Sequence, residues 1–195
     1  MISKAGRAPP PTPEAAMREG RRLTCNAVWC RFRVPVLALI GLAGALAATV
    51  VSAPAPRLVW NVSASAPRGL YAVSPAAAIA RGDTVIAWVP SEWRRLAALR
   101  RYIPINVPLV KRVAAGPGDR VCADGIELRV NERWAAARRD LDGRGREMPA
   151  WEGCVTLGAG CFLLLNDAPD SFDGRYFGPT GQDDIVGKAR LLWRA

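Results

Sequence analysis

The chain has 195 residues, a formal net charge of +10 and no histidine. The lack of histidine excludes a Ser-His-Asp triad, a Cys-His pair and every histidine-containing metal site. A serine nucleophile in this chain would therefore need another base, and lysine is the known substitute. Lysine is scarce: Lys4, Lys111 and Lys188 stand against 24 arginines, which do not give up their proton in a protein.

A basic, proline-containing tail at residues 1–33 precedes an uncharged run at residues 34–53. The 20 residues of this run predict a helix of roughly 30 Å, enough to cross the hydrocarbon core of a bilayer. A cleaved signal peptide is the alternative, but the run is long for one, and Pro54 and Pro56 follow the candidate cleavage sites. Five arginines in the 16 residues before the run, against two in the 16 after it, place the tail in the cytoplasm and residues 54–195 outside it.

The segment beyond the predicted membrane helix has the pattern of a mainly β domain with one helix. Ser91 is expected to cap a helix that ends near Tyr102, and residues 131–152 are expected to form a long irregular loop. A hairpin is expected about Asp124-Gly125, and a strand pair about the turn at residues 158–160. The expected strands cover residues 84–89, 109–113, 121–130, 155–157, 161–165 and 185–193.

Three of the five cysteines lie beyond the predicted membrane helix, where disulfides persist. Cys122, Cys154 and Cys161 allow three pairings. We favour Cys122–Cys154, because Cys161 opens a strongly apolar strand and is expected to be a buried thiol. Cys25 and Cys30 have no other ligands nearby in the tail, so they are expected to be reduced thiols and not a metal site.

Ser65 and Lys111 are the candidate nucleophile and base. Ser65 follows Ala53 by 12 residues, so at most roughly 40–43 Å of extended chain separates it from the end of the predicted membrane helix. Lys111 alternates with Leu109 and Val113, and a strand would place all three on one apolar face. Burial there would lower the pKa of the amine, as a base requires. The alternative is a lysine whose stem lies on apolar surface while its ammonium reaches water.

A second polar segment, at residues 166–179, lies between two expected strands. Taken alone, it is expected to be an acidic surface loop with a local ion pair between Asp173 and Arg175.

Three segments in chain order resemble the signal peptidase family of membrane-bound Ser-Lys proteases. They are Ser65-Ala66-Pro67, then Lys111-Arg112-Val113 followed by Pro117-Gly118-Asp119, then Ser171-Phe172-Asp173-Gly174-Arg175. The patterns Asn61-x-Ser63-x-Ser65-x-Pro67-x-Gly69-x-Tyr71 and Arg175-Tyr176-Phe177-Gly178-Pro179 are similar to the TraF branch, the maturation proteases of conjugative transfer systems. The chain departs from the housekeeping enzymes at Ala66, at Gly174 and at Asn166-Asp167, where those enzymes have Met, Ser and Gly-Asp-Asn.

The resemblance implies that Ser65 is the nucleophile and Lys111 the general base of a serine endopeptidase. It also implies three supporting roles. Ser63 helps to stabilise the oxyanion, Ser171 forms a hydrogen bond with the lysine amine, and the pair Asp173 and Arg175 braces the site. The implied fold is a domain of coiled antiparallel sheets, and no cofactor or metal is implied.

The same resemblance implies a protein of the bacterial inner membrane with its catalytic domain in the periplasm. Its substrate would be a membrane-embedded pilin precursor or other preprotein, cleaved after a small residue, with cyclisation of the pilin as one outcome. Inner-membrane lipid and other transfer or secretion proteins are the expected partners. One alternative is a general type I leader peptidase, and another is a noncatalytic pilus assembly module. The positive charge also permits nucleic-acid binding, but the predicted topology argues against it.

Overall fold

The computed structural model describes residues 33–49, 56–75 and 78–195, which divide into two compact units at Pro54. In the first unit, residues 33–49 form a helix with exposed side chains. Within the described ranges, no helix is both long and apolar enough to cross a membrane. The membrane helix at residues 34–53 therefore stays a prediction, and its last four residues lie outside the described ranges. Cys25 and Cys30 also lie outside them.

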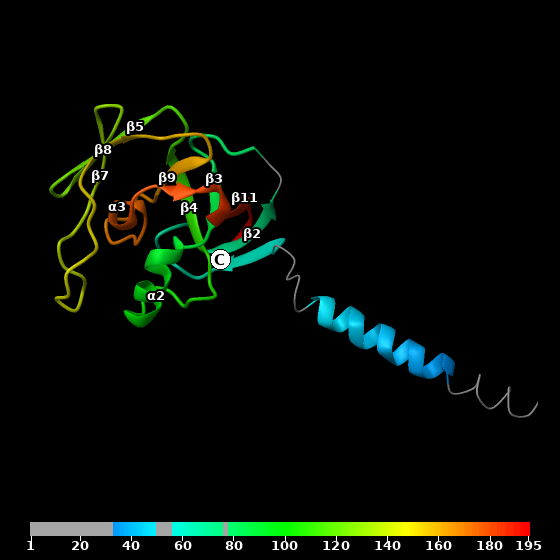
Figure 1. Cartoon of the computed structure of the whole chain (residues 1–195). Helices are drawn as coiled ribbons and strands as arrows, with labels where there is room; N and C mark the ends of the chain where they lie inside the picture. Colours follow the sequence, from blue (N-terminus) through cyan, green and yellow to red (C-terminus); the bar gives the residue numbers. More distant parts are fainter. Residues whose placement is uncertain (1–32, 50–55, 76–77) are drawn as a thin grey trace, which may run out of the picture. The chain divides into compact units, whose positions relative to one another are not determined.

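Two antiparallel sheets build the second unit (Figure 1). The larger sheet has the order β1-β2-β11-β3-β4-β9-β10, and the smaller has the order β7-β6-β5-β8. The strands of the larger sheet are β1 (Leu58–Asn61), β2 (Gly69–Ser74), β3 (Thr84–Ala87), β4 (Leu109–Ala115), β9 (Cys161–Leu165), β10 (Thr180–Gly181) and β11 (Ile185–Arg194). Those of the smaller sheet are β5 (Arg120–Asp124), β6 (Glu127–Val130), β7 (Arg133–Ala137) and β8 (Gly153–Thr156). The helical elements are α2 (Ser91–Leu99), α3 (Gly174–Phe177) and a 3₁₀ turn, η1 (Gln182–Asp184).

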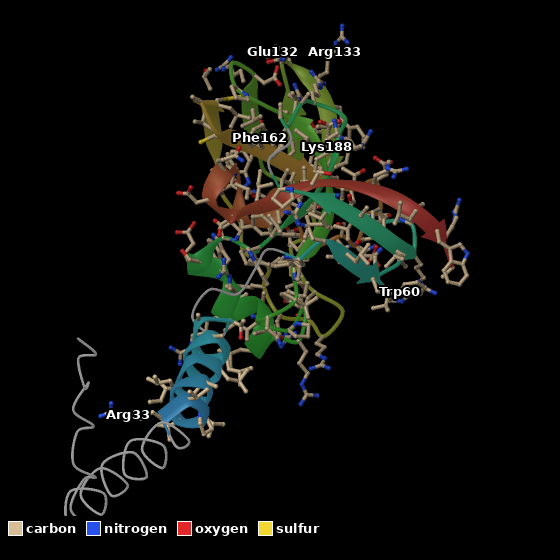
Figure 2. The ribbon with its side chains drawn as sticks, turned by 90° about the vertical axis from the view of Figure 1, so that its right-hand side faces the viewer. Arg33, Trp60, Glu132, Arg133, Phe162 and Lys188 are labelled. Atoms are coloured by element: carbon tan, nitrogen blue, oxygen red, sulfur yellow. A yellow bond between two sulfur atoms is a disulfide. The ribbon has the colours of Figure 1, made fainter. Side chains whose placement is uncertain are left out.

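The hydrophobic core fixes the smaller sheet against one face of β4 and β9. Val121 and Leu128 from the smaller sheet pack with Leu163 from β9, and all three side chains are fully buried. Val113 and Leu164 belong to a second cluster, which includes Phe162. Burial of each large aliphatic side chain contributes about 1.5–3 kcal/mol, so this core holds the strand that carries Lys111. Figure 2 shows Phe162 within the sheet and Trp60 projecting from its edge.

The prediction of a mainly β domain is confirmed, and most expected strands are present. The hairpin about Asp124-Gly125 is the β5–β6 pair, in which Asp124 is opposite Glu127. The last expected strand is β11, which stays continuous past Gly187 through a shift in register. Such irregularities bend a strand and add curl to the sheet. Cys122 and Cys154 face each other across β5 and β8 and form a disulfide, as favoured from the sequence.

Four local expectations are wrong. The segment 131–152 is not a continuous loop, because it contains β7. Asn131 and Glu132, both at positive φ, form the tight turn that leads into this strand. Residues 155–157 and 161–165 do not pair, since β8 and β9 belong to different sheets. Ser91 begins α2 but does not cap it; the cap position is Pro90, without a side-chain hydrogen bond. Cys161 is a free thiol, but it is only partly buried.

Candidate active site

A cavity of about 420 Å³ in the second unit brings together four of the six predicted site residues. Ser63 and Ser65 come from the loop between β1 and β2, Lys111 from β4, and Ser171 from the loop that follows β9. Apolar side chains form much of the remaining wall: Val59, Val62, Ile103, Val107, Leu109 and Phe172. The arrangement is a largely apolar cleft with a few hydroxyl groups, the amine of Lys111, the amide of Asn61 and the carboxylate of Asp170, as small-molecule and peptide sites commonly are.

The loop that carries Ser65 is held by a buried side chain at its base. Asn61 Nδ2 lies 3.1–3.2 Å from the carbonyl oxygens of Ser63, Ala66 and Pro67, and its Oδ1 accepts the Ser63 N–H at 3.0 Å. An amide has only two N–H donors, so the three carbonyls share them. The loop therefore follows a fixed path without forming a helix or a strand.

Ser63 lies against Ser65 within this loop. The two Oγ atoms are 3.0 Å apart, and the Ser65 N–H donates to Ser63 Oγ at 3.3 Å. A backbone N–H and a hydroxyl group next to a nucleophile are the two donor types that stabilise an oxyanion in acyl transfer.

Lys111 is buried, with only 2% of its surface exposed. The alternative in which its ammonium reaches water is therefore wrong. Nζ donates to Ser171 Oγ at 2.6 Å and lies 3.9 Å from Asp173 Oδ2. Burial lowers the pKa of Lys111 from 10.5 to about 8, and it outweighs the negative charge of Asp173, which acts in the opposite direction. Arg175 lowers this pKa further, and Asp170 raises it.

Lys111 and Ser65 line the same cavity, but within the described part of the chain they share no hydrogen bond. Catalytic hydrogen bonds are often long in a site without substrate and tighten in the complex, so this geometry does not argue against a Ser-Lys pair.

Asp173 and Arg175 lie behind the lysine and are both almost fully buried. Asp173 Oδ1 accepts hydrogen bonds from the backbone N–H and from Nε of Arg175, which makes it the cap of α3. Arg175 also donates to the carbonyl oxygens of Asn166, at 2.6 Å, and Ala137, at 3.2 Å. The expected ion pair between Asp173 and Arg175 is confirmed at 2.8 Å, but its expected place in a surface loop is wrong, because both side chains are buried.

Gly174, between the members of this pair, lies close to β9. A Cβ atom there would be 2.9 Å from both Leu163 Cδ1 and Leu164 O. The absence of a side chain at this position therefore allows α3 to pack against the strand.

Two residues of the site were not predicted from the sequence, Asn61 and Asn166. Asn61 lies in a segment quoted above, but the pattern alone did not indicate its role. Asn166 follows the last residue of β9 and is 8% exposed. A polar residue directly after a strongly apolar strand was the available signal.

The described residues contain no group of three or more Cys, Asp or Glu side chains arranged to hold a metal ion. The chemistry that the arrangement offers is that of a serine hydroxyl near a buried amine.

Comparison with known proteins gives the family of the chain. The family model for signal peptidase, peptidase S26, matches residues 29–194. A conjugal transfer protein TraF from Agrobacterium tumefaciens (strain 15955) is 31% identical over 172 residues, which cover 84% of this chain and 97% of that protein. A plasmid transfer protein TraF from Escherichia coli is 38% identical over 91 residues. That match covers 44% of this chain and about half, 51%, of the Escherichia coli protein.

Among solved structures, a signal peptidase I from Enterococcus faecalis V583 is 21% identical, with a TM-score of 0.33 over 60% of this chain and 98% of that chain. The resemblance inferred from the sequence motifs is confirmed by the family match and by the TraF relatives. On this evidence the chain belongs to the signal peptidase family, peptidase S26.

Proposed function

We propose that this protein is a membrane-bound serine endopeptidase in which Lys111 activates Ser65 to cleave a pilin precursor. The observation that carries the proposal is the position of Lys111 in the cleft. Its amine is buried, hydrogen-bonded to Ser171 and lines the same cavity as Ser65. A lysine placed in this way has a pKa close to the range in which a general base works best.

In the proposed reaction, neutral Lys111 takes the hydroxyl proton of Ser65 as Oγ attacks the carbonyl carbon of the scissile peptide. The Ser65 N–H and the Ser63 hydroxyl stabilise the oxyanion. The C–N bond then breaks, and the leaving amine takes the proton from Lys111, which leaves an acyl-enzyme on Ser65. Ser171 orients the amine of Lys111, while Asp173 and Arg175 hold the surrounding structure.

Either water or an amine of the substrate completes the reaction. Lys111 removes a proton from the incoming nucleophile, the new bond to the acyl carbon forms, and Ser65 leaves with its proton restored. Water gives a cleaved pilin with a new carboxylate. An internal amine gives a cyclic pilin, whose mass is lower than that of the cleaved linear pilin by the mass of one water molecule.

The membrane context of the proposal rests on the uncharged run at residues 34–53 and on the arginines before it. The protein would be anchored once in the bacterial inner membrane, with the tail at residues 1–33 in the cytoplasm and residues 54–195 in the periplasm. A pilin precursor in the same membrane would then meet the site near the membrane surface. Lipid and other transfer proteins would be its neighbours.

The TraF relatives are described as conjugal or plasmid transfer proteins, which favours a pilin substrate over general exported preproteins. A general type I leader peptidase is the second candidate. A noncatalytic assembly module is the third candidate. The buried amine of Lys111 in the cavity that Ser65 also lines argues against it.

The test is cleavage of the pilin precursor in membranes that contain the full-length protein. The variants are Ser65→Ala, Lys111→Arg and, as a matched control, Lys188→Arg. Lys188 (labelled in Figure 2) is a half-exposed lysine that pairs with Asp83 at 2.7 Å and does not line the cavity. Arginine keeps the positive charge but cannot act as a base, because its guanidinium group does not lose its proton in a protein. Loss of cleavage in the first two variants with an active control is expected. Activity in Lys111→Arg would remove the lysine from the mechanism.

A further inference from the structure

Asn166 joins three parts of the site that come from distant segments of the chain. Its side-chain Oδ1 accepts the Arg112 N–H at 3.2 Å, and its Nδ2 donates to Val110 O at 3.0 Å. These two backbone groups flank Lys111 on β4. The side chain of Asn166 thus forms hydrogen bonds with the backbone of β4 on both sides of Lys111. These bonds take the place of the backbone hydrogen bonds that one more residue of β9 would make.

The backbone of Asn166 connects the same residue to the buried brace. Its N–H donates to Asp173 Oδ2 at 3.1 Å, and its carbonyl accepts from Arg175 at 2.6 Å. Every polar group of Asn166 therefore has a partner, although the residue is only 8% exposed. Such a connected network holds its members in one arrangement.

The remaining contact of Asn166 is to the nucleophile. Its Nδ2 lies 3.5 Å from Ser65 Oγ, a long hydrogen bond of the kind that can tighten when a substrate is bound. A donor to Oγ occupies an oxygen lone pair and leaves the hydroxyl proton of Ser65 to point elsewhere, either to Ser63 Oγ at 3.0 Å or to a base in the cleft.

Among side chains of this size, only the amide of asparagine can make all three of these contacts. The position needs one acceptor, for Arg112 N–H, and two donors, for Val110 O and Ser65 Oγ. An aspartate carboxylate has the same shape but no donor when ionised. The partners also fix the orientation of the amide, because Oδ1 must face the N–H and Nδ2 the carbonyl.

We infer that Asn166 is a positioning residue of the active site, which sets the place of Lys111 relative to Ser65 and directs the Ser65 hydroxyl proton toward the base. This inference rests on the proposed function, since it assumes that Ser65 and Lys111 react together.

The test compares Asn166→Asp and Asn166→Ala with the wild type in full-length protein. The readout is the rate at which an alanine phosphonate, a serine-directed probe, modifies Ser65, followed by mass spectrometry from pH 6 to pH 10. Gln182→Glu is the matched control, because it makes the same amide-to-acid change on an exposed side chain in η1. Thermal unfolding of each variant shows whether it is folded at the assay temperature.

In Asn166→Asp the plateau rate is expected to fall about tenfold or more, because the donor to Ser65 is lost and a carboxylate there attracts the hydroxyl proton. The rise in rate with pH is also expected to move to higher pH. A new negative charge stabilises the protonated form of Lys111, adding to Asp173 and Asp170 and opposing Arg175.

In Asn166→Ala the plateau is expected to fall by a similar factor while the midpoint stays closer to that of the wild type, since no charge is added. A role in folding alone would lower the melting temperature and leave the plateau and midpoint of the folded protein unchanged. Either that result or wild-type behaviour of both variants would overturn the inference. If Asn166→Asp does not fold, the plateau of Asn166→Ala decides.

The same experiment separates this inference from the proposed function. If the probe does not modify Ser65 in the wild type, with Ser65→Ala as the blank, the proposed function fails. If the wild type is modified and both Asn166 variants react at its rate, only the role of Asn166 fails.

Discussion

Replacing Lys111 with methionine removes a buried amine whose pKa is about 8 in the folded protein and 10.5 ordinarily. Because the folded-state pKa is the lower one, the unfolded chain binds more protons between these two pH values, and the stability of the wild type rises with pH across that window. Below about pH 8 both states are protonated, so the cost of the buried ammonium is constant and fully present. The difference in pKa corresponds to about 3 kcal/mol. Lys111→Met lacks this contribution at every pH.

The measurement is urea unfolding of full-length wild type and Lys111→Met in detergent, followed by tryptophan fluorescence at pH values from 7 to 11. Groups that titrate in both proteins cancel in the difference between the two free energies of unfolding. That difference, wild type minus variant, is expected to be flat up to about pH 8 and then to rise by about 3 kcal/mol. Lys188→Met, which removes a half-exposed ammonium, is the control for the loss of a lysine as such. A flat or falling difference across the whole range would refute the argument that burial dominates the environment of Lys111.

Three further predictions follow from the surrounding structure. Asp173→Asn leaves Arg175 buried without its charged partner, so the free energy of unfolding should fall by about 3–5 kcal/mol in urea titrations. The pKa of Lys111 should fall as well, moving the acid limb of peptidase activity to lower pH, and an unmoved limb would contradict the contact at 3.9 Å. Asn61→Ala removes the hydrogen bonds at the base of the Ser65 loop and should lower the free energy of unfolding by about 1–3 kcal/mol. The alanine phosphonate should also modify Ser65 more slowly in this variant, and an unchanged rate would show that the loop holds its path without these hydrogen bonds. The double variant Cys122→Ser, Cys154→Ser should lose about 2–4 kcal/mol of stability in thermal unfolding, whereas Cys161→Ser, which removes the free thiol, should change it little; equal losses would assign the effect to cysteine packing.

The sequence predicted secondary structure best where a local pattern agrees with the burial of the side chains. Alternation at residues 109–113 predicted β4 and placed Lys111 on a face with Leu109 and Val113, but it left open whether the ammonium is buried or reaches water. The Asp124-Gly125 turn predicted its hairpin because that dipeptide has a specific backbone preference. The motifs predicted which residues would gather in the cleft, and Ser63, Ser65, Lys111 and Ser171 all line it. Their catalytic roles remain predictions.

The features that the sequence did not predict depend on contacts between distant segments. Nothing local shows that β8 pairs with β5 and not with β9, because the four residues of β8 are all exposed and their pattern selects no partner. The turn at Asn131 and Glu132 was missed because glutamate seldom adopts positive φ. The burial of Arg175 follows from four carbonyl and carboxylate partners that come together only in the fold.

The two proposed reacting residues lie in parts of the sheet that differ in how readily they open. Lys111 is on β4, which pairs with β3 on one side and β9 on the other, whereas Ser65 follows β1, a four-residue strand whose one partner among the described strands is β2. Edge strands with exposed side chains open locally at a lower free energy than central strands. Amide hydrogens of the Ser65 loop should therefore exchange with solvent much faster than those of β4. We therefore expect β4 to keep Lys111 in place even when the segment that carries Ser65 opens.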